Sequence, residues 1–335
     1  MAAMALNVAV IGLGWWGRII VPLASTSAKL RVVRVADPAP AAAGFAAEQG
    51  IPLSKDLDDV LRDPEVQGVV LCTPHTQHTE QIVRAASAAK HVFCEKPLSL
   101  SRVDVLRAVD ACNRNGVKLA VGHEKRFEPP IMEVMRLVKA GELGTPLQVE
   151  ANFLQDKFLS LPPDNWRLSA KEAPAGPMTA TGIHLLDLSV GVFGPAERVF
   201  ACVRQLGSQL VNGDTLGILV NFRTGGNALL GAVLATPFDG RFAVYGSKGW
   251  AEVRDKAHPE SPQGWTLTVQ LRGQPKTVRE YPPAKAVLAN LEAFAEAAAG
   301  GAPYPVPQSE MIANVSALEA IFRSAQTGRV EPVES

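Results

Sequence analysis

The stretch Asn7–Gly17, NVAVIGLGWWG, decides the fold. It begins as an apolar, strand-like run and ends in the pattern G-x-G-x-x-G, directly before a helix-like segment. The first glycine permits a tight turn, the second lets the backbone approach a pyrophosphate, and the third lets the helix pack near the strand. The free N–H groups at the start of that helix favour an anionic group. This turn is predicted to bind a dinucleotide through Gly12, Gly14, Trp15, Trp16 and Gly17.

An acidic residue follows at the spacing that NAD recognition requires. Asp37 ends the next apolar run and lies 20 residues after Gly17 (37 − 17). A carboxylate at this point accepts hydrogen bonds from the ribose hydroxyls of NAD and repels the extra phosphate of NADP. The adjoining segment Pro38–Pro40 contains no arginine for that phosphate. NAD is therefore the expected cofactor, and NADP stays open as an alternative.

Strand-like and helix-like segments alternate through the first 122 residues. The strand-like runs are apolar without alternation, which is typical of strands buried on both faces of a parallel sheet. The alternation of strand-like with helix-like segments predicts βαβ units in a doubly wound parallel sheet. The expected strands are Asn7–Gly12, Leu30–Asp37, Val66–Thr73, His91–Cys94 and Val117–Gly122, and the expected helices are Trp15–Ala28, Ala39–Gln49, Gln77–Ala89 and Ser101–Asn115.

The pattern changes after Gly122. A helix is expected at Pro129–Leu143, and from Leu147 onward the strand-like runs alternate, as in antiparallel strands with one covered face. Further helices are expected at Ile183–Val192, Ala284–Ala299 and Ser309–Ala325. We therefore expect a first domain over residues 1–123 and a second over 124–335, with one closing helix packing back on the first.

Composition excludes several classes of partner. The 335 residues carry 33 Lys+Arg and 33 Asp+Glu, and no basic block is present, so nucleic acid and anionic membranes are not expected partners. No apolar run approaches the length of a membrane span, and the N-terminus lacks a basic, signal-like start. The four cysteines form no CxxC pair, as is typical of reduced thiols. These features predict a cytoplasmic protein with a small-molecule substrate.

Polar residues follow three of the predicted parallel strands. Because such strands end at one edge of the sheet, their following loops should surround one crevice. Four histidines near these loops lack the H-x-x-x-H and H-E-x-x-H spacings of zinc sites, so no metal is expected. Beyond the glycine turn, the residues expected near the cofactor are Thr73, Pro74, His75, His78, Glu95 and Lys96.

Several motifs together resemble the glucose–fructose oxidoreductase / inositol dehydrogenase / MocA family. The resemblance covers about residues 6–195 and implies a Rossmann domain followed by an α+β domain with a large, open, mostly antiparallel sheet. It also implies hydride transfer between NAD(P) and a CH–OH or ketone of a sugar, cyclitol or related polyol, in homodimers or homotetramers formed through that sheet. Arg126, at the domain border, joins the expected cofactor-binding residues. The motifs are GLGWWG (12–17), ADP (36–38), TPHTQHTE (73–80), CEKPLS (94–99), RFEPP (126–130) and GIHLLDL (182–188).

The resemblance also assigns candidate catalytic residues. The lysine of its E-K-P motif carries over to Lys96, and the histidine of its G-x-H motif to His184. Oxidation of an alcohol requires a proton acceptor, and histidine titrates near neutral pH. We hypothesise that His184 is the principal base and that Lys96 stabilises the developing oxyanion. Asp187 shares a helix face with His184 and either orients the imidazole or serves the structure, through capping or an arginine pair.

One position departs from the family pattern. Relatives commonly carry an aspartate four residues before the histidine, where this chain has Ala180. With the apolar region around Phe153, Phe158 and Leu159, this leaves open a dehydrogenase of a non-sugar substrate such as an aromatic dihydrodiol. A catalytically weak, nucleotide-binding regulator is a further alternative. The long loop Leu161–Gly176 contributes Trp166 and Arg167 as a substrate wall, or else is anchored by its tryptophan.

Overall fold

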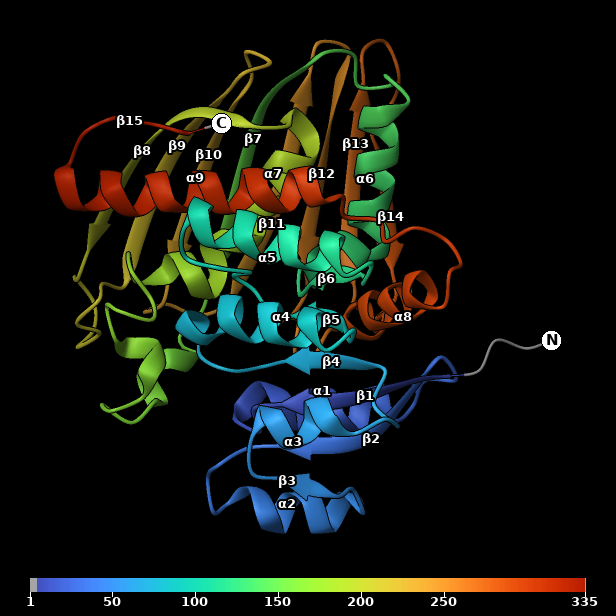
Figure 1. Cartoon of the computed structure of the whole chain (residues 1–335). Coiled ribbons are helices and arrows are strands. Elements are labelled where there is room, and N and C mark those ends of the chain that lie inside the picture. The colour runs from blue at the N-terminus through green and yellow to red at the C-terminus, as the bar shows by residue number, and fades with distance from the viewer. Residues whose placement is uncertain (1–4, 335) are drawn as a thin grey trace. The chain divides into compact units, whose positions relative to one another are not determined.

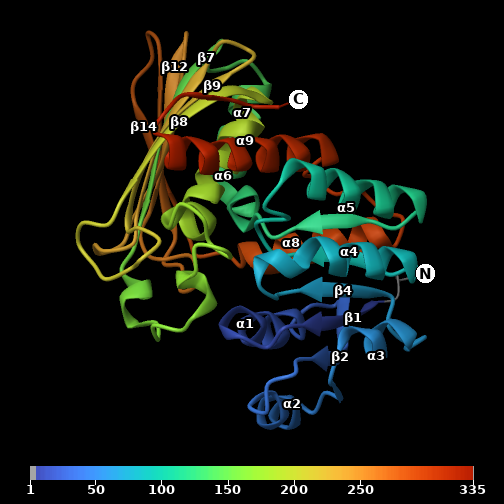
Figure 2. The ribbon, with the colours of Figure 1, turned by 60° about the vertical axis from the view of Figure 1, so that its left-hand side comes forward.

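The computed structural model describes residues 5–334, which form two units (Figures 1 and 2). The first unit extends to Glu124 and also includes Val287–Met311. The second comprises Lys125–Ala286 and the segment from Ile312 onward. In this part of the chain, no helix combines the length and apolar character needed to cross a membrane.

The first unit contains a six-stranded parallel sheet in the order β3-β2-β1-β4-β5-β6. Strand order reverses between β1 and β4, and dinucleotides bind at such a switch point. This topology confirms the predicted doubly wound Rossmann sheet. The strands are β1 Leu6–Ile11, β2 Leu30–Ala36, β3 Leu53–Ser54, β4 Gly68–Leu71, β5 His91–Cys94 and β6 Leu119–Val121.

Helices cover this sheet because each buries one apolar stripe. Ile20 and Val21 of α1 pack with Val8 of β1, and Phe294 of the late helix α8 enters the same core. The helix α5 begins at a cap, since the Ser101 hydroxyl accepts a hydrogen bond from the Asp104 N–H at 3.2 Å. The helices are α1 Trp15–Ala24, α2 Ala42–Gln49, α3 Leu57–Arg62, α4 His78–Ser87, α5 Arg102–Arg114 and α8 Ala286–Ala298.

The second unit contains a nine-stranded sheet in the order β14-β13-β12-β11-β7-β10-β9-β8-β15. Neighbours are antiparallel except β7 and β10, which run parallel from Asn227 opposite Gln148. The predicted mostly antiparallel sheet is therefore confirmed. Its strands are β7 Pro146–Leu154, β8 Ala196–Arg204, β9 Thr215–Phe222, β10 Asn227–Val233, β11 Asp239–Gly246, β12 Gly249–Asp255, β13 Trp265–Leu271, β14 Thr277–Tyr281 and β15 Glu331–Pro332.

One face of this second sheet is covered by helices. Figure 2 shows α6, α7 and α9 on the same side of the strands. Along β7, Val149, Ala151 and Phe153 are buried while the residues between them, Glu150 and Asn152, are only partly buried, as expected for alternating strands with one covered face. The helical elements are α6 Pro129–Lys139, α7 Ile183–Phe193 and α9 Gln308–Thr327, and a π-helical turn at Met178–Gly182 precedes α7.

Candidate active site

The glycine turn has the geometry that a dinucleotide requires. Gly12 has φ +92°, and a Cβ there would lie 2.8 Å from the Cys72 carbonyl oxygen. A Cβ on Gly17 would lie 1.9 Å from the Gly12 oxygen, so only glycine fits at both positions. A Cβ on Gly14 would meet nothing within 4 Å, and no side chain caps the helix that begins there. Open backbone at a helix N-terminus fits a diphosphate.

Asp37 connects this turn to the loop after β2. Its carboxylate accepts hydrogen bonds from the Leu13 N–H at 2.6 Å and the Ala39 N–H at 2.8 Å. A carboxylate offers about four acceptor sites, so two remain for ribose hydroxyls. Arg18, which the sequence argument overlooked, donates to the carbonyls of Leu13 and Ala41, each at 2.9 Å. The guanidinium therefore fixes the same loop through backbone contacts.

Glu95 ends up buried beside the candidate catalytic lysine. One carboxylate oxygen accepts from the Lys96 N–H at 3.2 Å, and a Cβ on Gly122 would lie 2.5 Å from that oxygen. Burial, followed by the charge of Glu124, raises the pKa of Glu95 to about 7, although Lys96 and Trp16 act in the opposite direction. Glu95 therefore changes charge near neutral pH, at the residue preceding Lys96.

This raised pKa predicts a pH-dependent stability. A carboxyl group whose folded pKa exceeds its unfolded value stabilises the fold below about pH 4.5, and that contribution is lost as pH rises through about 7. Glu95→Gln should abolish the decline, because the amide does not titrate. Between pH 5 and 7.5 we expect the Tm of the wild type to fall by about 5 °C relative to the variant. Parallel curves by differential scanning calorimetry would contradict the assignment.

The predicted loop residues after β4 lie around His78. The Thr73 hydroxyl donates to the Gln81 side chain at 2.6 Å, and the His75 ring meets the His78 ring edge-on at 5.9 Å. The His78 side chain is fully buried, with its ring nitrogens against the carbonyl oxygens of Pro97 and Thr73. His78 therefore connects the loops that follow β4 and β5.

In the second unit, His184 lies in aromatic and apolar surroundings. It is buried in α7, and its ring centroid lies 6.0 Å from that of Phe153. Phe153 also contacts Phe238 and His258 edge-on. Ala180, in the π-helical turn before α7, packs against a buried apolar cluster. The cluster consists of Phe158, Leu168, Leu210 and Leu234.

Asp187 pairs with Arg126. Its carboxylate accepts from the guanidinium Nε at 2.6 Å and Nη2 at 2.9 Å, and its backbone carbonyl accepts from Nη2 at 2.7 Å. A Cβ on Gly191 would lie 2.6 Å from the same guanidinium, so the arginine is seated closely on α7. This contact matches the arginine-pair alternative for Asp187. It also directs the Arg126 side chain, expected at the cofactor, to a carboxylate of its own unit.

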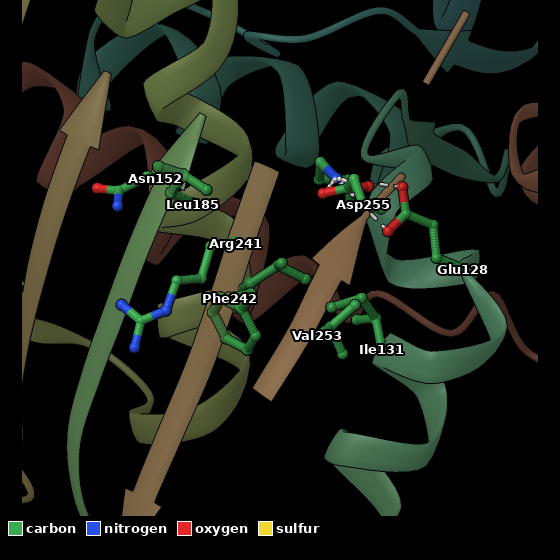
Figure 3. A pocket seen from close by; sticks show the side chains of 10 residues that line it. Glu128, Ile131, Asn152, Leu185, Arg241, Phe242, Val253 and Asp255 are labelled. Carbon is green, nitrogen blue, oxygen red and sulfur yellow. Dashed lines mark hydrogen bonds and ion pairs between the residues drawn. The ribbon is translucent and has the colours of Figure 1, made fainter. Parts of the chain in front are cut away.

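A buried ion cluster lies beside these residues and was missed by the sequence argument (Figure 3). The Lys125 ammonium donates to Asp255 at 3.0 Å and Glu128 at 3.2 Å, and the Trp265 indole donates to Asp255 at 2.9 Å. Lys125 also lies 5.3 Å from the centroid of the Phe153 ring. The cluster borders a small pocket at β7, β11 and β12 and contacts Phe153, which in turn contacts His184.

The remaining candidates concern the long loop and metal binding. The Arg167 guanidinium stacks on the Trp166 ring at 4.2 Å, and the Asn212 amide donates to the carbonyls of Arg167 and Ala173. Asn212 therefore holds the loop at its backbone, while the role of Trp166 as a wall or an anchor stays a prediction. Over residues 5–334, no group of three or more His, Cys, Asp or Glu side chains is placed to hold a metal ion.

Comparison with known proteins identifies the class. Residues 6–123 match the oxidoreductase family with an NAD-binding Rossmann fold, and residues 131–252 match the GFO/IDH/MocA C-terminal domain. These matches together cover more than half of the chain. The chain therefore belongs to the Gfo/Idh/MocA oxidoreductase family, which confirms the predicted resemblance, enzyme class and NAD cofactor.

Individual relatives are similar over most of their length. The uncharacterized oxidoreductase YrbE of Bacillus subtilis is 29% identical over 67% of this chain, a match spanning 65% of YrbE, just under two thirds. Inositol 2-dehydrogenase of Rhizobium meliloti is 29% identical over 73% of this chain and 74% of that protein. The aldose-aldose oxidoreductase of Caulobacter crescentus, crystallised with glycerol, is 28% identical with a TM-score of 0.86, over 98% of this chain and 99% of that one.

Proposed function

We propose that this oxidoreductase transfers hydride between NAD and a CH–OH or ketone of a sugar, cyclitol or related cyclic polyol. The observation that carries the proposal is the Glu95–Lys96 turn, which follows β5 on the same sheet edge as the glycine turn. Relatives named as inositol 2-dehydrogenase and aldose-aldose oxidoreductase support the substrate class.

The chain's own residues would then divide the work. NAD, when bound, supplies the hydride acceptor, held by the glycine turn and by Asp37. His184 takes the hydroxyl proton during oxidation and returns it during reduction. The Lys96 ammonium donates a hydrogen bond to the oxygen as negative charge develops. Asp187 and His184 lie on the same helix, α7, and Arg126 holds that helix through its contacts with Asp187.

A substrate screen tests this proposal. Purified protein is mixed with NAD, or separately NADP, and with inositols, aldoses and 1,5-anhydro sugars, while absorbance at 340 nm reports reduced nicotinamide. We expect turnover with at least one ring alcohol and faster turnover with NAD than with NADP. Tight NADH binding without turnover of any compound would instead favour the nucleotide-binding regulator.

A non-sugar ring alcohol is a second candidate substrate because of Ala180. Its methyl group packs on an apolar cluster that includes Phe158 and Leu234, one turn before His184. An apolar surface there offers no partner for a substrate hydroxyl, whose desolvation would then go uncompensated. Including dihydrodiols and cyclohexanediols in the screen separates the two classes, since this candidate requires them to have the higher kcat/KM.

We further propose that copies of the chain associate through the open face of the second sheet. Phe200, Leu219 and Leu229 lie opposite one another on β8, β9 and β10, and each is more than a third exposed. A contiguous apolar row of this kind is typical of an interface. A homodimer or homotetramer would cover it.

The oligomer prediction is tested by a charge placed in the row. Leu219→Lys should shift the protein to a smaller species in sedimentation velocity at micromolar concentration, because a buried ammonium without a partner opposes association. Val103→Lys, exposed on α5 of the first unit, is the matched control and should leave the assembly unchanged. A wild type that sediments as a monomer would rule out the interface.

We also propose that the protein works in the cytoplasm. No disulfide forms within residues 5–334, and burial raises the pKa of Cys94 and raises that of Cys112 to about 12. Both therefore stay as unreactive thiols. Fractionation of cells that produce the protein, with a cytoplasmic marker enzyme followed alongside, tests this location.

A further inference from the structure

His78 joins the two loops that follow β4 and β5. Its Nδ1 lies 2.8 Å from the Pro97 carbonyl oxygen, and its Nε2 lies 2.9 Å from the Thr73 carbonyl oxygen. The side chain has no exposed surface and begins the helix α4. Both contacts are with acceptors, so each becomes a hydrogen bond only when the facing ring nitrogen carries a proton.

The two loops carry the residues on which the proposed reaction depends. Pro97 directly follows Lys96, and the peptide bond between them is cis. Thr73 lies next to the glycine turn, because a Cβ added to Gly12 would come within 3.1 Å of the Thr73 backbone nitrogen. His78 therefore links Thr73, beside the glycine turn, to Pro97, beside Lys96. These two residues follow the adjacent strands β4 and β5.

We infer that His78 is a positioning residue for Lys96, acting through its hydrogen bond to the Pro97 carbonyl. A buried ring on a helix, held between two carbonyls, fixes the lysine backbone relative to the glycine turn. Displacement of a reacting group by about 1 Å can cost about 100-fold in rate, so such a constraint affects catalysis without contact to substrate. The expected effect on kcat rests on the proposed function, whereas the expected ordering of the Lys96 backbone by His78 is independent of it.

Two amide variants separate the two hydrogen bonds. In His78→Asn the amide nitrogen replaces Nδ1 and retains the bond to Pro97, whereas in His78→Gln it replaces Nε2 and retains the bond to Thr73. His78→Leu retains neither. Ile82→Val, fully buried in the same helix, is the matched control, because it lowers stability and leaves the His78 ring and both of its carbonyl partners unchanged.

Hydrogen–deuterium exchange on the NADH-saturated protein is the deciding measurement. We expect residues 95–99 to exchange about tenfold faster in His78→Gln and His78→Leu than in the wild type, and within about threefold of it in His78→Asn. The inference is overturned if Asn and Gln variants behave alike, or if Ile82→Val produces the same change.

Steady-state kinetics with a substrate from the screen adds the functional readout. We expect kcat to fall at least tenfold in His78→Gln, with His78→Asn closer to the wild type. A screen without any substrate would defeat the proposed function, while exchange would still decide the role of His78. Equal kcat in both amide variants would overturn the catalytic consequence.

Discussion

Lys96→Met should lower kcat/KM for the best substrate by about 100- to 1,000-fold, because loss of one oxyanion donor costs this much in other enzymes. The methionine retains the length of the side chain and removes its charge and donors. His184→Asn should cost about 100- to 10,000-fold, the usual contribution of a general base.

Controls separate these effects from damage to the fold. Lys118→Met removes an exposed lysine from the same unit and should leave kcat/KM unchanged. NADH affinity, measured by fluorescence titration, should change less than tenfold in His184→Asn, because that residue lies in the unit without the glycine turn. A variant at Lys96 or His184 that retains more than a third of wild-type kcat/KM would remove that residue from the mechanism.

The first unit was predictable because its signals are local. The glycine turn and each valine-rich strand are defined by residues within a few positions of one another, and Asp37 is defined by its spacing of 20 residues from Gly17. The short helix α3 was missed, since six residues are too few for helical periodicity to emerge. Its cap, the Asp56 carboxylate accepting from the Asp59 N–H at 3.0 Å, is also a common sequence pattern.

The sequence allowed only those candidate site residues to be placed that directly follow a predicted strand. Glu95 and Lys96 follow β5 directly, so their place at the sheet edge was expected. His78 contacts Pro97 across 19 residues, and Lys125 contacts Asp255 across 130. Such pairs depend on packing between elements that are distant in the chain. Motifs and periodicity in a single sequence do not reveal which of these residues meet. The contact between Asp187 and Arg126 is likewise a matter of packing, across 61 residues, which is why the sequence left the arginine pair open as one of two alternatives.

The buried cluster around Lys125 leads to the largest expected change in stability. Lys125, Glu128 and Asp255 each have side chains less than a tenth exposed. Lys125→Met leaves two carboxylates buried close together with no cation between them. Breaking a buried pair in this way costs about 3–5 kcal/mol in the free energy of unfolding. We expect Tm to fall by about 10 °C at pH 7, measured by calorimetry.

The comparison with other variants shows whether charge is the cause. Lys29→Met breaks an exposed pair with Glu296 and should leave the Tm nearly unchanged, because solvent screens such pairs. The triple variant Lys125→Met, Glu128→Gln, Asp255→Asn removes every charge and should recover much of the loss, since neutral amides are cheaper to bury than unpaired carboxylates. A deficit that persists in the triple variant would mean that Lys125 acts through its packing on Phe153 and not through its charge.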